Sequence, residues 1–237
     1  MRDILKAIVY VLRRGGAWRL LPHDLPPWKT VYHYFRLWRW QGLWDTLHRA
    51  LHAAVRIKAG RDPQPRAAII DSQSVKTTVV GGPRGYDGAK KVNGRKRHLL
   101  VETQGLILHA VVHPADIADR DGARLVLDAI QDRWPRVCHL WADRGYRGKV
   151  IEWIKPQLGW TVEVVKRPSK WGRYPIEVEP PPLPAFTVLP RRWVVERTFA
   201  WLVTNRRLAK AYEKLPATSE AFIYLAMARV MVRRLAH

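Results

Sequence analysis

The sequence predicts an α/β protein, a mixed sheet covered by helices, with a small N-terminal all-α domain. Residues 1–60 place apolar side chains at helical spacing. Residues 60–65 (GRDPQP) then have the composition of a linker. From residue 66 on, the segments run strand, hairpin, helix, strand, helix, strand and helices, an order typical of an α/β fold. We therefore expect a helical domain at 1–60 and a second domain at 66–237.

The net charge indicates the class of partner. The chain has 237 residues, 47% of them hydrophobic, which is enough for a sizeable core and excludes a disordered protein. It carries 42 Lys and Arg against 20 Asp and Glu, a formal net charge of +22. Such an excess attracts polyanions, of which nucleic acid is the commonest in a cell. Basic ribosomal proteins and membrane-surface proteins share this property, so charge alone does not identify an activity.

Cysteine content and hydropathy indicate the compartment. The single cysteine, Cys138, excludes an intramolecular disulfide and fits a reducing cytoplasm. It lies in an apolar run, where we expect a buried side chain. No signal peptide opens the chain, and no apolar stretch is long enough to span a bilayer. We expect a soluble cytoplasmic protein with no membrane partner.

The N-terminal segment reads as three helices. The first ends at Gly15-Gly16, and the others are expected over 30–40 and 43–59. Most of its tryptophans are interpreted as core. The alternative is a helix-turn-helix-like DNA reader. The outer face of its second helix would then carry Lys29, His33, Arg36 and Arg39.

Within the second domain, strands and helices are assigned from their periodicity. Strands are expected at 67–70, 98–102, 106–112, 137–142 and 160–165, and helices at 121–134, 192–210 and 219–235. The proline-rich stretch 167–190 is expected to be a loop.

Two of the apolar runs end in an aspartate, AAIID at Asp71 and VCHLWAD at Asp143. In parallel neighbouring strands both carboxylates would emerge at the carboxyl edge of the sheet, where open α/β sheets bind ligands. Two nearby carboxylates repel, and a divalent cation relieves the repulsion. Oxygen ligands favour magnesium or manganese over zinc. The alternative is that each aspartate only caps a turn; their pairing in a strongly basic chain favours the metal site.

Glu196 is the third candidate ligand. It lies in a predicted helix, PRRWVVERTFAWLVTNRRL, beside the inward apolar face. A glutamate there is commonly a partnered structural residue, but two aspartates at the sheet edge favour a ligand. Arg192 and Arg207 are expected on roughly the same side of this helix, where they could neutralise a phosphodiester.

Five segments resemble consecutive boxes of insertion-sequence DDE transposases of the IS-five group, within the larger IS-four-type class. They are IIDSQSVKTT (69–78), GGPRGYDGAKKVNGRKRHLLVET (81–103), HPADIADRDGA (113–123), WADRGYRGK (141–149) and RRWVVERTFAWL (191–202). The resemblance extends over almost the whole chain.

The resemblance implies a retroviral-integrase-like (RNase H-like) fold, with Asp71 on the first strand, Asp143 on the fourth and Glu196 on a later helix. It implies DNA transposition, in which two magnesium ions, replaceable by manganese, activate water and then a DNA 3′-hydroxyl, with no covalent protein–DNA intermediate. The expected partner is double-stranded DNA, as terminal inverted repeats and target, bound by a homodimer.

Two departures from the family pattern stand out. The wider class has a Tyr, Arg, Glu, Lys signature, of which Arg192 and Glu196 are present. The tyrosine position is Leu189 and the lysine position is Val203. Arg206 or Arg207 is the candidate for the missing charge. Relatives also usually have several dozen residues before the segment that begins here, so we expect a truncated copy or a misplaced start.

Further basic residues are expected along the DNA path. A predicted turn around Asn93-Gly94 is crowded by Lys90, Lys91, Arg95, Lys96 and Arg97, and Lys76 follows Asp71 closely. The alternative to a DNA contact is that these residues form a solvated charged face. Tyr146 either stacks on a base or packs. His98 and His113 are expected to form hydrogen bonds and not to bind metal.

The leading functional hypothesis is an active transposase. Its rivals are a relative that only hydrolyses DNA and a catalytically inactive DNA-binding remnant that acts as a repressor. The complete Asp, Asp, Glu set favours catalysis, and the short N-terminus favours the remnant.

Overall fold

The computed structural model describes residues 1–130, 132–165 and 191–237, so the expected loop 167–190 lies outside the described residues. The helices are α1 (Arg2–Arg14), α2 (Trp28–Trp40), α3 (Leu43–Lys58), α4 (Asp119–Leu127), α5 (Lys149–Leu158), α6 (Arg192–Val203) and α7 (Pro216–Ala236), with short 3-10 turns η1 (Trp18–Leu20), η2 (Arg144–Tyr146) and η3 (Arg206–Leu208). The strands are β1 (Ala67–Lys76), β2 (Gly85–Asp87), β3 (Val92–Glu102), β4 (Ile107–Pro114), β5 (His139–Ala142) and β6 (Thr161–Val164).

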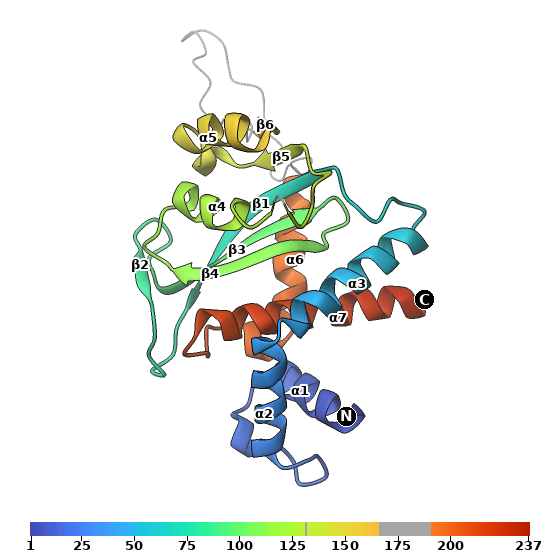
Figure 1. The fold of residues 1–237 in the computed structure, drawn as a ribbon. Helices are drawn as coiled ribbons and strands as arrows, with labels where there is room; N and C mark the ends of the chain where they lie inside the picture. The colour runs from blue at the N-terminus through green and yellow to red at the C-terminus, as the bar shows by residue number, and fades with distance from the viewer. Residues whose placement is uncertain (131, 166–190) are drawn as a thin grey trace, which may run out of the picture.

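The strands form one mixed sheet (Figure 1). Its order is β3, β1, β5, β6, and both β2 and β4 pair with β3. The β1–β3 and β3–β4 pairs are antiparallel, whereas β1–β5 and β5–β6 are parallel. The parallel half needs helical crossovers, which α4 and α5 provide. The structure therefore has the mixed sheet covered by helices that the sequence predicts.

The alternation of side chains along β1 divides the core between the two faces of the sheet. Ile69 faces one apolar cluster, which contains residues of α6, α7 and the N-terminal helices. Ala68 and Ile70 face another, which contains residues of α4 and α5. Whichever face carries Ile69 also carries Asp71, two residues on, so Asp71 belongs to the α6 side.

The N-terminal helices share the larger core (Figure 1). Phe35 of α2 stacks on Phe222 of α7 with ring centroids 4.7 Å apart. Arg56 of α3 forms a buried ion pair with Glu102 of β3, 2.6 Å long. Arg39, expected on an outer face, is half-buried and donates to the hydroxyl of Thr218. Packing is thus continuous across residues 60–65, and the division into two domains stays a prediction.

Three local expectations are corrected. Asn93 and Gly94 lie inside β3, and the turn falls at 88–91. A Cβ at Gly94 would lie 1.9 Å from the Val75 carbonyl oxygen, so this glycine serves close strand approach. Helix α4 ends at Leu127 because the chain turns to bury Trp134, whose indole donates to the Leu108 carbonyl. Cys138 is exposed, since it precedes β5 and its strand run starts at His139.

In the described ranges, no helix is both long enough and apolar enough to cross a bilayer.

Candidate active site

Strand register brings the two aspartates together. In the parallel β1–β5 pair, Ile69 lies opposite Trp141. Asp71 and Asp143 each follow by two residues, so they occupy equivalent positions on the same face. Contrary to expectation, Asp71 does not end its strand, because β3 continues to pair with β1 as far as Lys76. It is β5 that ends here, at Ala142, and this opens the sheet beside Asp71.

Helix α6 supplies the third carboxylate and a cation. Arg192 Nη2 lies 3.8 Å from Asp71 Oδ2, 3.8 Å from Asp143 Oδ2 and 3.5 Å from Glu196 Oε1. No two of these oxygens can therefore be further apart than twice 3.8 Å. The structure brings together the three predicted carboxylates around Arg192, a residue that the sequence had placed against phosphate.

Burial and repulsion make Asp71 electrostatically unusual. Its side chain is only 16% exposed. Burial raises the pKa of Asp71 to about 6, and Asp143 adds to the rise, while the Ser72 amide and Arg192 oppose it. A carboxylate that is costly to charge at neutral pH gains from a nearby cation. The positive charge of Lys90 also opposes the rise in the pKa of Asp71. The Lys90 ammonium lies close by and donates to the Ser72 carbonyl at 3.2 Å.

The donor set fits a hard divalent cation by its chemistry, since all three converging side chains offer carboxylate oxygens. Their spacing is set by Arg192, which lies between them. As they stand, no three acidic, histidine or cysteine side chains in the described part of the chain form a metal-binding group. For these carboxylates to hold a cation, they would have to move closer together and the Arg192 guanidinium would have to leave the space between them.

A buried polar network supports the aspartates from the other face of the sheet. Tyr146, in η2 just after Asp143, is 2% exposed and lies 2.7 Å from His98 Nε2. His98 Nδ1 lies 3.2 Å from His113 Nε2. The hydroxyl of Tyr146 also contacts that of Ser72, the neighbour of Asp71. Tyr146 therefore links the two segments that carry the aspartates, and the two histidines form hydrogen bonds as expected.

Gly122 of α4 allows the helix to cover this network. A Cβ at Gly122 would lie 2.5 Å from His98 Nδ1 and 2.6 Å from His113 Nε2. Only a residue without a side chain leaves room for the two imidazoles. Ser72 extends the network outward by donating to Asp119 at 2.8 Å. Sequence reasoning did not find Ser72 or Asp119, and only the adjacency of Ser72 to Asp71 could have indicated either.

Several predicted DNA contacts are corrected because the side chains are buried in the fold. Arg95 and Arg97 are 0% and 1% exposed. Arg95 donates to the carbonyls of Pro83, Gly81, Glu213 and Lys214, and Arg97 to those of Leu208 and Lys210. Lys96 is buried against Asp119, 3.0 Å away. These three cations hold the 208–214 segment and α4 to the sheet and do not face an exposed DNA path.

Arg207 is also corrected. Helix α6 ends at Val203, so Arg207 lies beyond it in η3 and does not share a side with Glu196. It is buried, pairs with Glu213 at 2.6 Å and donates to the Gly16 carbonyl at 2.7 Å. It therefore cannot replace the family's missing lysine at the carboxylates. Leu189, at the tyrosine position, lies outside the described residues.

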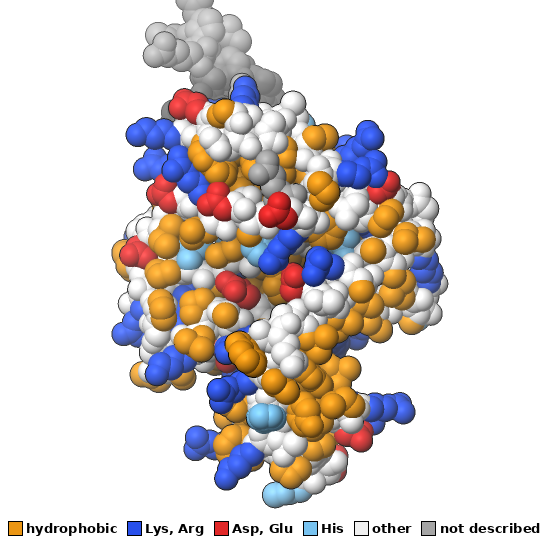
Figure 2. All heavy atoms as spheres, viewed as in Figure 1, with side chains coloured by type: hydrophobic (Ala, Val, Ile, Leu, Met, Phe, Trp, Pro, Cys, Tyr) orange, Lys and Arg blue, Asp and Glu red, His pale blue; other side chains and the backbone are white. Residues whose placement is uncertain are grey.

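The remaining predicted contacts are exposed. They are Lys29 and Arg36 on α2, Lys76 at the end of β1, Lys90 and Lys91 in the 88–91 turn, and Arg206 in η3. Figure 2 shows Lys and Arg side chains projecting along the margins of one face, including the part formed by α1 and α2. Their contact with DNA stays a prediction.

Comparison with known proteins identifies the family. The "Transposase DDE domain" family matches residues 62–231, and the "Putative transposase of IS4/5 family" matches residues 1–48. A Burkholderia cepacia protein named "Putative transposase for insertion sequence element IS402" is 29% identical over 173 residues, 68% of this chain and 72% of its own. An "Insertion element IS402 uncharacterized 16.2 kDa protein" from the same organism is 38% identical over 82 residues, 34% of this chain and 54% of its own.

The family match explains the site. Its residues 62–231 contain all three converging carboxylates and most of the chain. The sheet order and the helices on both faces agree with the RNase H-like fold of that family. This chain belongs to the transposase DDE domain family of the IS4/IS5 type and functions in DNA transposition.

Proposed function

We propose that Asp71, Asp143 and Glu196 bind magnesium and carry out both DNA cleavage and strand transfer. The observation that supports this is their convergence on Arg192, within 3.8 Å of one guanidinium nitrogen. A bound divalent ion would activate the attacking oxygen and stabilise the leaving one, and manganese would substitute. The complete carboxylate set favours an enzyme over a DNA-binding remnant that acts as a repressor.

Each side chain has a distinct role in this proposal. Asp71 in β1 and Asp143, directly after the neighbouring β5, would hold the cation in a fixed position relative to the sheet. Glu196 is 54% exposed and approaches from α6, so it closes the site from the solvent side. Arg192 neutralises the carboxylates until a substrate is present, and is placed to contact the phosphodiester when they turn to the metal.

The proposed partner is double-stranded DNA, as the element's terminal inverted repeats and the target. Lys90, which acts on Asp71, and the exposed Lys76 and Lys91 would line the approach to the site. One chain holds one set of carboxylates, whereas an element has two ends to cut and join. We therefore propose that two copies assemble on DNA, in the bacterial cytoplasm where the chromosome lies.

The test is a cleavage-and-joining assay on labelled duplexes that carry the element's ends. The parent should cut the ends with magnesium, join them to a target plasmid and lose both activities in EDTA. Asp143→Asn should bind the ends and do neither, while Glu152→Gln, an exposed acid on α5, should match the parent. Cutting without joining would favour the hydrolytic relative. Binding without cutting by the parent, with manganese as well, would favour the remnant.

A further inference from the structure

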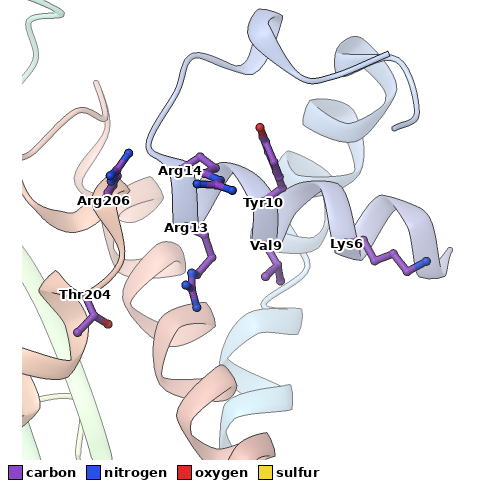
Figure 3. A pocket seen from close by; sticks show the side chains of 7 residues that line it. All are labelled: Lys6, Val9, Tyr10, Arg13, Arg14, Thr204 and Arg206. Carbon is purple, nitrogen blue, oxygen red and sulfur yellow. The ribbon is translucent and has the colours of Figure 1, made fainter. Parts of the chain in front are cut away.

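A strongly basic pocket lies between α1 and the segment that follows α6. Its volume is about 540 Å³. It is lined by Lys6, Val9, Tyr10, Arg13, Arg14, Thr204 and Arg206. Figure 3 shows Arg14 and Arg206 lining the same space from the two different segments. None of these described lining residues is acidic, so the pocket concentrates positive charge at the surface.

The arginines of this α1–η3 pocket have no acidic partner. Among the described residues Arg13, Arg14 and Arg206 form no ion pair, and the nearest compensation is the Tyr10 ring, 5.9 Å from the Arg14 guanidinium carbon. Lys6 pairs only with Asp3, on the open surface. Arg13 also acts on Arg229, whose pKa is lowered by burial and by repulsion from Arg13 and Arg233. The free protein therefore tolerates mutual repulsion that a polyanion would relieve.

The dipole of α1 explains only part of this charge. Arg13 and Arg14 lie in its last turn, where the helix dipole favours cations. Lys6 lies further back on the helix, and Arg206 belongs to another element. The end of α1 gives no reason for either of them to face the same space.

The two walls are held at a fixed separation by the backbone. Gly15 ends α1 with a φ of 76°, and a Cβ there would lie 3.0 Å from the Arg206 carbonyl carbon. The buried Arg207 donates to the Gly16 carbonyl and pairs with Glu213, which ties η3 to the end of α1. The backbone segments that carry the cations are therefore already held together before an anion binds, so only the side chains need to be ordered.

We propose that the α1–η3 pocket binds the phosphodiester backbone of duplex DNA engaged at the active site; this rests on the proposed function. Guanidinium groups bind phosphate through paired donors, and the Tyr10 hydroxyl adds a neutral donor, whereas the Thr204 hydroxyl already donates to the Trp201 carbonyl at 2.7 Å. Glu196 and Thr204 are eight residues apart along α6 and its cap, about 12 Å of helix. A duplex at the carboxylates, whose phosphates recur along both strands, can thus place another phosphate in the pocket.

The experiment measures duplex binding by fluorescence anisotropy at several sodium chloride concentrations. The test variant is the double change Arg14→Gln, Arg206→Gln. The control, Arg120→Gln with Lys155→Gln, removes the same charge from exposed positions on α4 and α5. The test variant should lose affinity about tenfold near physiological salt, and its slope of log K against log salt should fall by about two units. The control should lose much less.

The outcomes separate the pocket from the proposed function. Equal losses in both double variants would reduce the effect to net charge and overturn the pocket. A parent that binds no duplex would overturn the proposed function and the pocket with it. The melting temperature of the test variant should stay close to that of the parent, because both arginines are exposed, so that a loss of affinity does not come from unfolding.

Discussion

The guanidinium of Arg192 lies 3.8 Å from the carboxylate of Asp71, with the carboxylates of Asp143 and Glu196 as close to the same nitrogen. One buried cation thus faces three acids. Arg192 balances most of their repulsion and links α6 to the edge of β1, so the same side chain serves stability and the electrostatics of the site.

Arg192→Gln should destabilise the protein in metal-free buffer by about 1–3 kcal/mol, because the largely buried Asp71 and the partly buried Asp143 lose their charge partner. Magnesium should then raise the melting temperature of the variant more than that of the parent. The control Arg133→Gln breaks a pair with Asp45, 3.3 Å long and far from the carboxylates, and should show no larger metal response than the parent. Identical metal responses in Arg192→Gln and the parent would separate Arg192 from the metal site.

Asp71→Asn should stabilise the protein while it abolishes nicking. The pKa of Asp71 is raised to about 6, so above that pH the folded state carries a carboxylate that is costly to charge. An amide removes this cost, about 1–3 kcal/mol at pH 8, and the gain should disappear near pH 4, where the acid is neutral in the folded protein. Urea unfolding at both pH values measures it. Asp24→Asn, at an exposed position, should change neither value.

Tyr146→Phe tests whether the network behind the aspartates positions them. Loss of the hydroxyl leaves Nε2 of His98 without a hydrogen-bond partner and unlinks the two aspartate-bearing segments, at a cost of about 1–3 kcal/mol. Nicking should slow and require more magnesium. Tyr224→Phe is the matched control, because this buried hydroxyl accepts from the Ala110 amide in the other core. An equal loss of stability with an unchanged magnesium requirement in both variants would make Tyr146 merely structural.

Buried histidines should make the protein sensitive to acid. Burial lowers the pKa of His52 and His98 to about 3, and of His48 and His109 to about 4, from 6.5. Below pH 6.5 the unfolded chain binds these protons and the folded chain does not, so the free energy of unfolding should fall as the pH drops from 6.5 towards 4. Asp71, Glu102 and Glu220, whose pKa values are raised by burial, act in the opposite direction, whereas the lowered pKa of His113 adds to the effect of the four histidines. A flat profile between pH 7 and 5 would contradict this.

His52→Leu should reduce that sensitivity. Neither ring nitrogen of His52 has a hydrogen-bond partner in the described structure. An apolar side chain of similar size should therefore be tolerated or stabilising. The free energy of unfolding should then depend less steeply on pH, because one titrating histidine no longer contributes. The exposed His23, changed to Leu, should leave the slope unchanged.

The carboxylates were predictable because their placement follows from local patterns. An apolar run that ends in an acid predicts a buried strand with the acid at the carboxyl edge of the sheet. Two such strands, parallel and in register, place Asp71 and Asp143 side by side. That β1 continues past Asp71 depends on pairing with β3, from Ser72 opposite His98 to Lys76 opposite Gly94, which no local pattern at Asp71 indicates.

The cations were not predictable in the same way. Arg95 and Arg97 were expected in an exposed basic run along the DNA path, but the 208–214 segment offers carbonyls that make their burial favourable. That segment is more than 100 residues away in the chain. Arg207 depends on where α6 ends: had the helix continued to 210, it would have lain near the side of Glu196, but the turn after Val203 directs it to Glu213.

The most direct test of the carboxylate site is magnesium-dependent nicking by Glu196→Gln. Its side chain is 54% exposed, so its loss should leave the fold and DNA affinity intact, and any effect on activity reports the chemistry. We expect no nicking of a plasmid carrying the element's ends at any magnesium or manganese concentration, while Glu152→Gln cuts like the parent. Nicking by Glu196→Gln at a rate comparable to that of Glu152→Gln would contradict the assignment of Asp71, Asp143 and Glu196 as one metal site.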